Sequence, residues 1–114
     1  MAEDNAINQK NLKLNEYVLI VDDEKDITDL IQNVCETLQY PCVSFTAAKD
    51  ALNAIDNTTI FLIISDIMMP HMNGIEFLKE VRKKLPSTPF VFLSAYLDKE
   101  KAVAAIKEGA NDIL

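Results

Sequence analysis

Short apolar runs recur along the chain and alternate with segments in which apolar residues return every three or four positions. Four runs predict strands, at positions 17–21, 42–45, 60–64 and 90–93. Residues 111–114 have the pattern of a fifth strand that is just beginning. The segments between the runs have the period of amphipathic helices. This alternation is typical of a parallel sheet covered by helices on both faces.

The expected helices begin and end at residues with known capping and breaking preferences. An apolar stripe runs from Ile27 to Leu38 and predicts a helix that stops before Pro41. Thr46 is the expected N-cap of the next helix, which runs to about Ile55.

Two further helices are expected in the second half of the chain. One follows Gly74, and the other begins at an Asp98 cap and closes at Gly109. The apolar side chains of this last helix are expected to face inward; they are Ala102, Val103, Ala105 and Ile106.

This order of elements predicts an α/β fold, a flavodoxin-like doubly wound parallel sheet with strand order 2-1-3-4-5. At 114 residues the chain is long enough for one domain but not for two. Residues 1–16 show no sustained period and are expected to form a flexible N-terminal tail, leaving residues 17–114 as the domain. The chain ends where the expected fifth strand is just beginning, so we expect a domain that is incomplete at its C-terminus.

Polar side chains follow three of the expected strands. Asp22 and Asp23 follow the first strand, Asp66 follows the third, and Ser94 follows the fourth. These strands are neighbours in the expected order, so their C-terminal ends lie side by side. Three carboxylates brought together repel one another unless a cation lies between them, and hard oxygen ligands suit Mg²⁺.

A carboxylate beside a bound metal ion can accept a phosphoryl group, because the metal neutralises charge on the transferring oxygens. The sequence has no Gly-rich phosphate loop of either common kind, so it does not indicate a nucleotide site. A simpler interpretation remains open. Asp66 then only caps the turn after its strand, and Asp23, Glu24 and Asp26 only favour the N-terminal end of a helix.

Composition argues against several classes of function. The formal net charge of −7 argues against non-specific binding to nucleic acid or an anionic membrane, which needs patches of Lys and Arg. No apolar run approaches the length of a membrane span and the N-terminus lacks a signal-peptide apolar region, so we expect a cytoplasmic protein. Cys35 and Cys42 are expected to be small buried hydrophobic residues rather than a disulfide or metal ligands.

Four motifs, in their order and spacing, resemble those of the receiver domain of two-component response regulators. Each motif alone is weak, but together they extend across residues 17–114. They are Asp22-Asp23 after the first strand, the run from Asp66 to Gly74 after the third, Ser94-Ala95 after the fourth, and the run from Gly109 to Asp112 before the fifth.

The resemblance implies that Asp66 is the phosphoacceptor and takes its phosphoryl group from the phosphohistidine of a histidine kinase or phosphotransfer protein. By the same resemblance Asp23, Asp66 and the backbone carbonyl of Met68 bind Mg²⁺ directly, whereas Asp22 acts through water. Such a domain is a signalling receiver rather than an enzyme. At most it catalyses its own phosphorylation and dephosphorylation.

Two more positions match the family, and two features depart from it. Ser94 resembles the switch hydroxyl that moves to the phosphoryl oxygen, and Tyr96 matches a position that tunes self-dephosphorylation. Ile113 stands where the family usually has Tyr or Phe. The chain stops two residues before the strand-five lysine, so we expect a receiver that is truncated before that lysine and the fifth helix.

These departures leave alternatives open. Without a fifth helix, apolar surface is expected to be uncovered on the face shared with the helix from Ile27 to Leu38, and a homodimer or domain swap is expected to cover it. The chain is otherwise a fragment of a longer regulator. A degenerate receiver that binds proteins without phosphorylation is a second hypothesis. A phosphohydrolase of small substrates is disfavoured, because Met68 occupies the nearest position for a second acid–base carboxylate.

Overall fold

The computed structural model describes residues 16–94 and 98–114 of the chain. Its strands are β1 (Glu16–Val21), β2 (Cys42–Phe45), β3 (Thr59–Ser65), β4 (Phe90–Phe92) and β5 (Asp112–Ile113). Its helices are α2 (Lys25–Thr37), α3 (Ala48–Ile55), α4 (Gly74–Lys84) and α5 (Lys99–Lys107). The tail expected over residues 1–16 lies outside the described residues, apart from Glu16, which begins β1.

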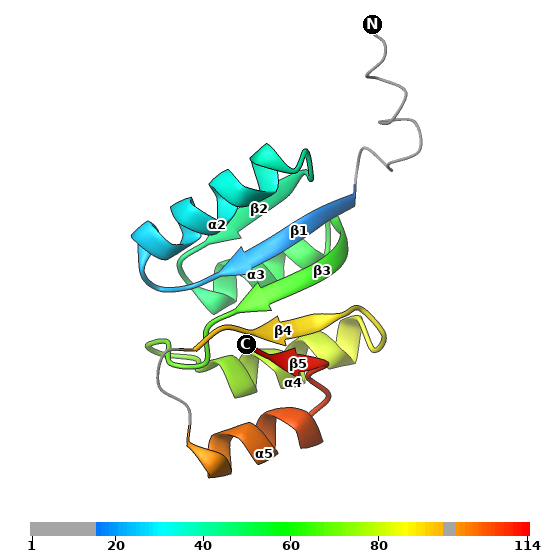
Figure 1. The fold of residues 1–114 in the computed structure, drawn as a ribbon. Coiled ribbons are helices and arrows are strands. Elements are labelled where there is room, and N and C mark those ends of the chain that lie inside the picture. The colour runs from blue at the N-terminus through cyan, green and yellow to red at the C-terminus, as the bar shows by residue number, and fades with distance from the viewer. Residues whose placement is uncertain (1–15, 95–97) are drawn as a thin grey trace, which may run out of the picture.

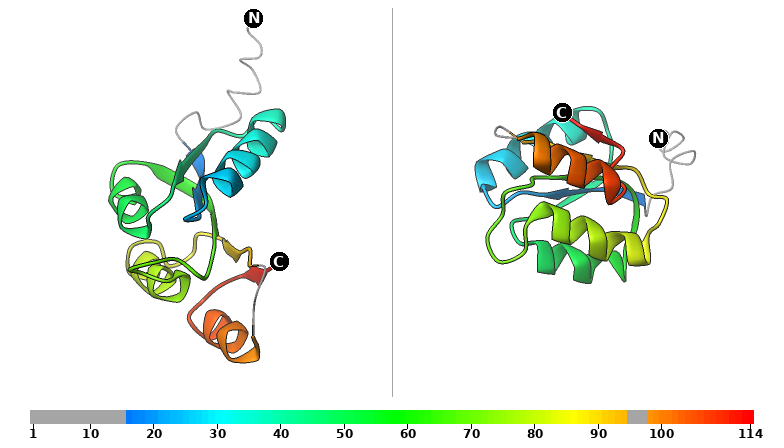
Figure 2. Two further views of the ribbon diagram at one scale, coloured as in Figure 1. Left: turned by 90° about the vertical axis from the view of Figure 1, so that its left-hand side faces the viewer. Right: turned by 90° about the horizontal axis from the view of Figure 1, so that it is seen from below.

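The strands form one parallel sheet in the order β2-β1-β3-β4-β5 (Figure 1). This order confirms the flavodoxin-like, doubly wound fold that the alternating pattern predicts. Helices connect the strands because neighbouring parallel strands need a crossover. Figure 2 shows α2 on one side of the sheet and α3 and α4 on the other. Among the helices of the described ranges, none is long and apolar enough to cross a membrane.

The register of the sheet brings the C-terminal ends of three strands level. Val21 of β1 pairs with Ser65 of β3, and Ser65 pairs with Phe92 of β4. The ladder continues past the strand ends, since the Asp66 N–H donates to the Val21 carbonyl and the Leu93 N–H donates to the Ser65 carbonyl, both at 2.9 Å. The residues that follow these strands therefore leave the sheet from one common edge.

Two apolar clusters fill the two faces of the sheet. The larger lies against α3, α4 and α5, and its fully buried aromatic side chains are Phe77, Phe90 and Phe92. The smaller lies against α2 and is built on Val18 and Ile20 of β1. The face that carries α3 and α4 is therefore the better packed of the two.

Helix caps confirm one prediction and contradict another. Asp98 caps α5, with its side chain accepting the Lys101 N–H at 2.8 Å. Thr46 was predicted to cap α3, but the N-cap is Ala47, whose carbonyl accepts the Ala51 N–H. The Thr46 prediction is wrong because helical geometry begins only at Ala48, which leaves Thr46 one residue outside the cap position.

The inward orientation predicted for α5 is wrong for two of its side chains. Val103 is 44% exposed and Ile106 is 54% exposed. The helix packs on the domain through one narrow side that carries the buried Ala105. Positions two before and one after Ala105 point away from that side, because successive helical residues are turned by about 100°.

Apolar surface is uncovered on the α2 face of the molecule, as the sequence led us to expect. Leu30, Val34 and Leu38 of α2 are 59%, 51% and 60% exposed. Beside them, Phe61 and Ile64 of β3 are only partly buried. The predicted apolar stripe from Ile27 to Leu38 therefore lies on one side of α2, but only part of it packs against the core.

Candidate functional site

Asp22, Asp23 and Asp66 come together where β1 and β3 end. One carboxylate oxygen from each residue lies within 4.8 Å of the other two. Asp22 is buried, Asp66 is half-buried and Asp23 is exposed, so the group is open to solvent on one side. Oxygens at this spacing can share one hard cation such as Mg²⁺. The prediction that the strand ends bring these carboxylates together is confirmed.

Backbone contacts fix the Asp22 side chain. Its Oδ1 accepts the Glu24 N–H at 2.9 Å, and its own N–H donates to the Phe45 carbonyl at 3.2 Å. Glu24 is the N-cap residue of α2 by backbone conformation, but its side chain makes no cap hydrogen bond. Helix capping alone therefore does not account for this group of acids.

Asp66 does fix the turn that follows β3, as the simpler interpretation expects. Its Oδ1 accepts the Met68 N–H at 3.3 Å. This contact orients the carboxylate toward the other two acids rather than withdrawing it from them, since all three still lie within 4.8 Å. Turn capping and a metal site are compatible at this residue.

The pKa of Asp22 and the pKa of Asp66 are both raised. Burial is the main reason that the pKa of Asp22 rises from 3.8 to about 6, and the neighbouring carboxylates raise it further, while the Glu24 N–H opposes the rise. Burial likewise raises the pKa of Asp66, against hydrogen bonds from the Met68 and Ile67 N–H groups. A bound cation reverses this effect because it favours the charged carboxylates. The site is thus electrostatically suited to a divalent metal.

The loop between β3 and α4 is anchored from within. Its Ile67 and Met69 side chains are buried in the larger core cluster. The Gly74 N–H donates to the Ile67 carbonyl at 2.7 Å, and His71 turns the chain with a φ of 69°. The Asp66 backbone is therefore held by the core on one side and by the start of α4 on the other.

A cavity of about 530 Å³ opens beside the three carboxylates. Besides these acids, its polar wall includes Glu24 and Ser94. Ser94 is partly buried and follows β4, so the predicted hydroxyl lines the same cavity as Asp66. Met68 also lines it, with its side chain 53% exposed. Tyr96, the remaining predicted residue, lies outside the described residues.

Sequence reasoning did not anticipate the other wall of this cavity. It is apolar and comes from α2 and the end of β4: Ile27, Leu30, Ile31 and Leu93. The helical stripe contained the signal, because its N-terminal half follows directly after the acids of β1. Glu24 also lines the cavity. Its position next to Asp23 in the sequence was the signal that could have predicted this.

A family model described as the response regulator receiver domain matches residues 18–114. The chain belongs to this family. Among its curated relatives, the response regulator SaeR of Staphylococcus aureus is 35% identical over 96 residues, or 84% of this chain and 42% of SaeR. The chain therefore spans less than half the length of the curated relatives that it matches.

Solved receiver structures have the same fold as this chain. The chemotaxis protein CheY4 of Vibrio cholerae has a TM-score of 0.83 and 30% identity, covering 87% of this chain and 84% of that one. The receiver domain of NtrX from Brucella abortus has a TM-score of 0.79 and 33% identity, covering 85% of this chain and 82% of that one.

As a receiver domain, the chain is a signalling module rather than an enzyme. The three acids, Asp22, Asp23 and Asp66, form the acidic triad that is typical of a receiver metal site.

Proposed function

We propose that this receiver domain accepts a phosphoryl group on Asp66, from the phosphohistidine of a histidine kinase or phosphotransfer protein, in a reaction that requires Mg²⁺. The observation that carries the proposal is the gathering of three carboxylate oxygens within 4.8 Å at the edge of the sheet. The raised pKa values of Asp22 and Asp66 support it. A bound cation favours the charged carboxylates and so offsets this rise.

In this proposal Asp23, Asp66 and the backbone carbonyl of Met68 bind Mg²⁺ directly, and Asp22 acts through water. The greater exposure of Asp23 supports its direct role, since it is the acid most open to an arriving ion. Asp22 is buried and already accepts the Glu24 N–H, which supports an indirect role. When bound, Mg²⁺ neutralises charge on the transferring phosphoryl oxygens.

The residues of the chain then orient the transfer. An Asp66 carboxylate oxygen attacks phosphorus, the P–N bond of the phosphohistidine breaks, and its electron pair stays on the imidazole nitrogen. The Met68 N–H on Asp66 Oδ1 holds the carboxylate during this step. The Ser94 hydroxyl, in the same cavity, is proposed to bond the phosphoryl group afterwards. A role for Tyr96 in dephosphorylation rests on the family resemblance.

Acetyl phosphate with Mg²⁺, followed by an intact-mass measurement, tests this function. We expect one phosphoryl adduct on the unmodified chain and none on Asp66→Asn. Asp23→Asn should need at least about tenfold more Mg²⁺ for the same yield. Asp29→Asn is a matched control, since Asp29 is an exposed acid of α2 that pairs with Lys25. An equal adduct on Asp66→Asn would contradict the proposal.

A second candidate function is protein binding without phosphorylation, and the uncovered apolar face of α2 favours it. We propose that a second copy of the chain covers this face, as a homodimer or a domain swap. Light scattering after size exclusion should then show a dimer that Val34→Glu dissociates. Val103→Glu is the control, because Val103 is an exposed apolar residue on α5. A monomer at every concentration would contradict this candidate.

We propose that the protein is cytoplasmic, with residues 17–114 as the receiver domain and residues 1–15 as a tail, since Glu16 already belongs to β1. The two free cysteines support this location, since disulfides are rare there. The negative net charge supports a protein partner rather than nucleic acid or an anionic membrane. Fractionation of cells that express the chain, with the protein recovered at the membrane, would contradict the placement.

A further inference from the structure

One apolar cluster between α2 and β2 holds two cysteines, one from each element. Cys35 is buried, Cys42 is partly buried, and both belong to the smaller apolar cluster. The two thiols lie close enough for each to affect the pKa of the other. The Cys42 Sγ also lies 4.0 Å from the carbonyl oxygen of Gln32, one helical turn before Cys35. The fold therefore brings together two thiols that lie seven positions apart in the sequence.

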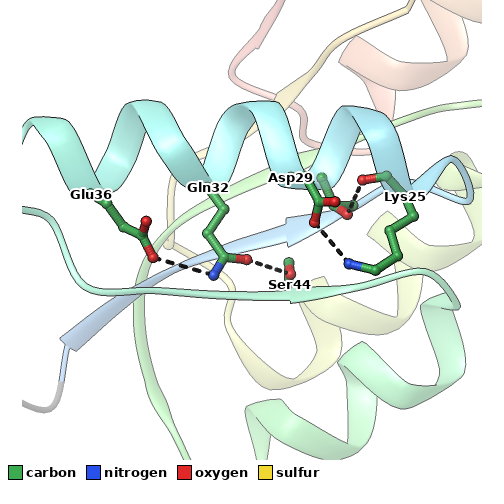
Figure 3. Close-up of polar contacts among 6 residues, drawn as sticks. Lys25, Asp29, Gln32, Glu36 and Ser44 are labelled. Atoms are coloured by element: carbon green, nitrogen blue, oxygen red, sulfur yellow. Dashed lines mark hydrogen bonds and ion pairs between the residues drawn. The ribbon is translucent and has the colours of Figure 1, made fainter.

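The elements that carry the two thiols are held in place independently. The Ser44 hydroxyl of β2 donates to Gln32 Oε1 at 2.9 Å, and the Gln32 amide donates to Glu36 Oε2 at 3.4 Å (Figure 3). On the strand side, the Val18 N–H of β1 donates to the Pro41 carbonyl at 2.9 Å. Because α2 and β2 are both held in place, the fold itself keeps the two thiols near each other.

We propose that Cys35 and Cys42 are a redox modification site, which a two-electron oxidant such as a peroxide converts into a reversible disulfide between α2 and β2. In the first step a thiol loses its proton and the thiolate attacks a peroxide oxygen. The O–O bond breaks, and the departing hydroxide takes up that proton, so a sulfenic acid and water result. In the second step the other thiol attacks the sulfenic sulfur and expels a second water. Overall, two thiols and one hydrogen peroxide give one disulfide and two waters.

The difference in exposure sets the order in which the two cysteines react. Cys42 reaches the surface more than Cys35 does, so it meets the oxidant first and Cys35 resolves the sulfenic acid. Burial raises the pKa of Cys42 to about 11 and also raises the pKa of Cys35. Because only the thiolate reacts, oxidation is slow at neutral pH and faster in alkaline solution. The pair therefore responds to sustained rather than brief oxidation.

The disulfide lies away from the phosphoacceptor. Cys42 pairs in the sheet with Val18, three residues before Val21, and the acids follow only after Val21. Oxidation should therefore tie the C-terminal half of α2 to β2 and stabilise the domain, while leaving transfer to Asp66 unchanged. This inference goes beyond the proposed function and does not depend on it.

Oxidation of the full chain tests the inference. The reduced protein is treated with diamide, which is selective for thiols and takes up two hydrogens, and separately with hydrogen peroxide. We expect the intact mass to fall by two hydrogens with diamide, and peptide mapping to find Cys35 joined to Cys42 with either oxidant. The Tm should rise by roughly 5–10 °C, and dithiothreitol should reverse every change.

Single substitutions provide the matched controls. Cys35→Ser and Cys42→Ser should each fold, keep the phosphorylation rate of the reduced protein, and show no oxidant-dependent rise in Tm. Thiols that stay open to alkylation after oxidation, or disulfides formed only between molecules, would overturn the inference. A failure of Asp66 to react with acetyl phosphate in both redox states would count against the proposed function alone.

Discussion

The backbone of Gly74 lies directly against the carbonyl oxygen of Asp66. A Cβ at position 74 would collide with that oxygen and would lie 2.7 Å from the Ile67 Cα and 2.8 Å from a ring carbon of Phe92. The same Asp66 oxygen accepts the buried Ser65 hydroxyl at 2.9 Å. The start of α4 and Asp66 therefore share one close backbone contact, so a change in one displaces the other.

Gly74→Ala should destabilise the domain and weaken the site together. We expect a loss of about 2–3 kcal/mol in the free energy of unfolding, because the new methyl group must displace backbone rather than a mobile side chain. The rate of adduct formation with acetyl phosphate should fall as well. Urea unfolding and intact mass measure the two effects.

Gly109→Ala is the control that distinguishes a general loss of stability from damage to the acidic site. Gly109 has a φ of 106°, so Ala is strained there too and should cost about 1–2 kcal/mol. It lies beyond the end of α5, against the Arg82 side chain rather than the acids. Its phosphorylation rate should match the unmodified chain. A Gly74→Ala variant that is unstable but phosphorylated at the normal rate would contradict the shared contact.

Asp22 should make metal-free stability fall with rising pH. Its pKa is about 6 in the fold against 3.8 unfolded, so the native state holds the proton more tightly. The stability that this proton contributes is fully present below about pH 4 and is lost as the pH rises to about 6, by up to about 3 kcal/mol. In EDTA, Asp22→Asn should therefore match the unmodified chain at pH 4 and exceed it at pH 7.

Mg²⁺ should reduce the stability difference between Asp22→Asn and the unmodified chain at pH 7, because we propose that it binds the charged triad of the unmodified chain. The comparison by urea unfolding at the two pH values uses Asp29→Asn as the control, an exposed acid outside the site. An Asp22→Asn variant with the same advantage at both pH values would show that its effect is not titration of this carboxyl group.

Gln39→Gly should stabilise the protein by about 0.5–1 kcal/mol. Gln39 follows Leu38, the C-cap of α2, with a φ of 64°, in a turn where the Tyr40 N–H donates to the Cys35 carbonyl at 2.8 Å. Gly109 has the equivalent place after α5, and glycine suits it. Glu36→Gly, inside the last turn of α2, should instead cost about 1 kcal/mol. A loss of stability in Gln39→Gly would contradict the strain argument.

Asn73→Ala should cost about 1 kcal/mol, because it removes a capping box at the start of α4. The Asn73 Oδ1 accepts the Glu76 N–H, and Glu76 Oε1 accepts the Asn73 N–H, both at 2.9 Å. Thr46→Ala is the matched control and should stay within about 0.5 kcal/mol, since Thr46 does not occupy the N-cap of α3. Thermal or urea unfolding distinguishes the two, and equal losses would contradict the cap assignment.

The sequence pattern predicts most of the fold because each apolar run is long enough to require burial. The run from Ile60 to Ile64 lies inside β3, and the acids after β1 and β3 meet because parallel strands end at one edge. The alternation of strands and helices at short intervals is typical of the doubly wound fold, and this predicts the order of the strands. This reasoning placed Asp22, Asp23, Asp66 and Ser94 around one cavity.

Other features depend on contacts that no local pattern encodes. Thr46 is a good cap residue, but the backbone stays extended through Ala47. Val103 and Ile106 have the spacing of an apolar helix face. They stay exposed because α5 packs on the core only through the side that carries Ala105. The approach of Cys35 to Cys42 depends on how α2 packs on β2. Each case was decided by packing between elements rather than by residue preference.

The position of the phosphoryl group tests most directly whether Asp66 is the phosphoacceptor. After reaction with acetyl phosphate and Mg²⁺, borohydride reduces an aspartyl phosphate to homoserine, and peptide mass spectrometry locates the changed residue. We expect homoserine at position 66 alone, and none when EDTA replaces Mg²⁺. Homoserine at position 22 or 23, or an unchanged Asp66 with Mg²⁺ present, would contradict it.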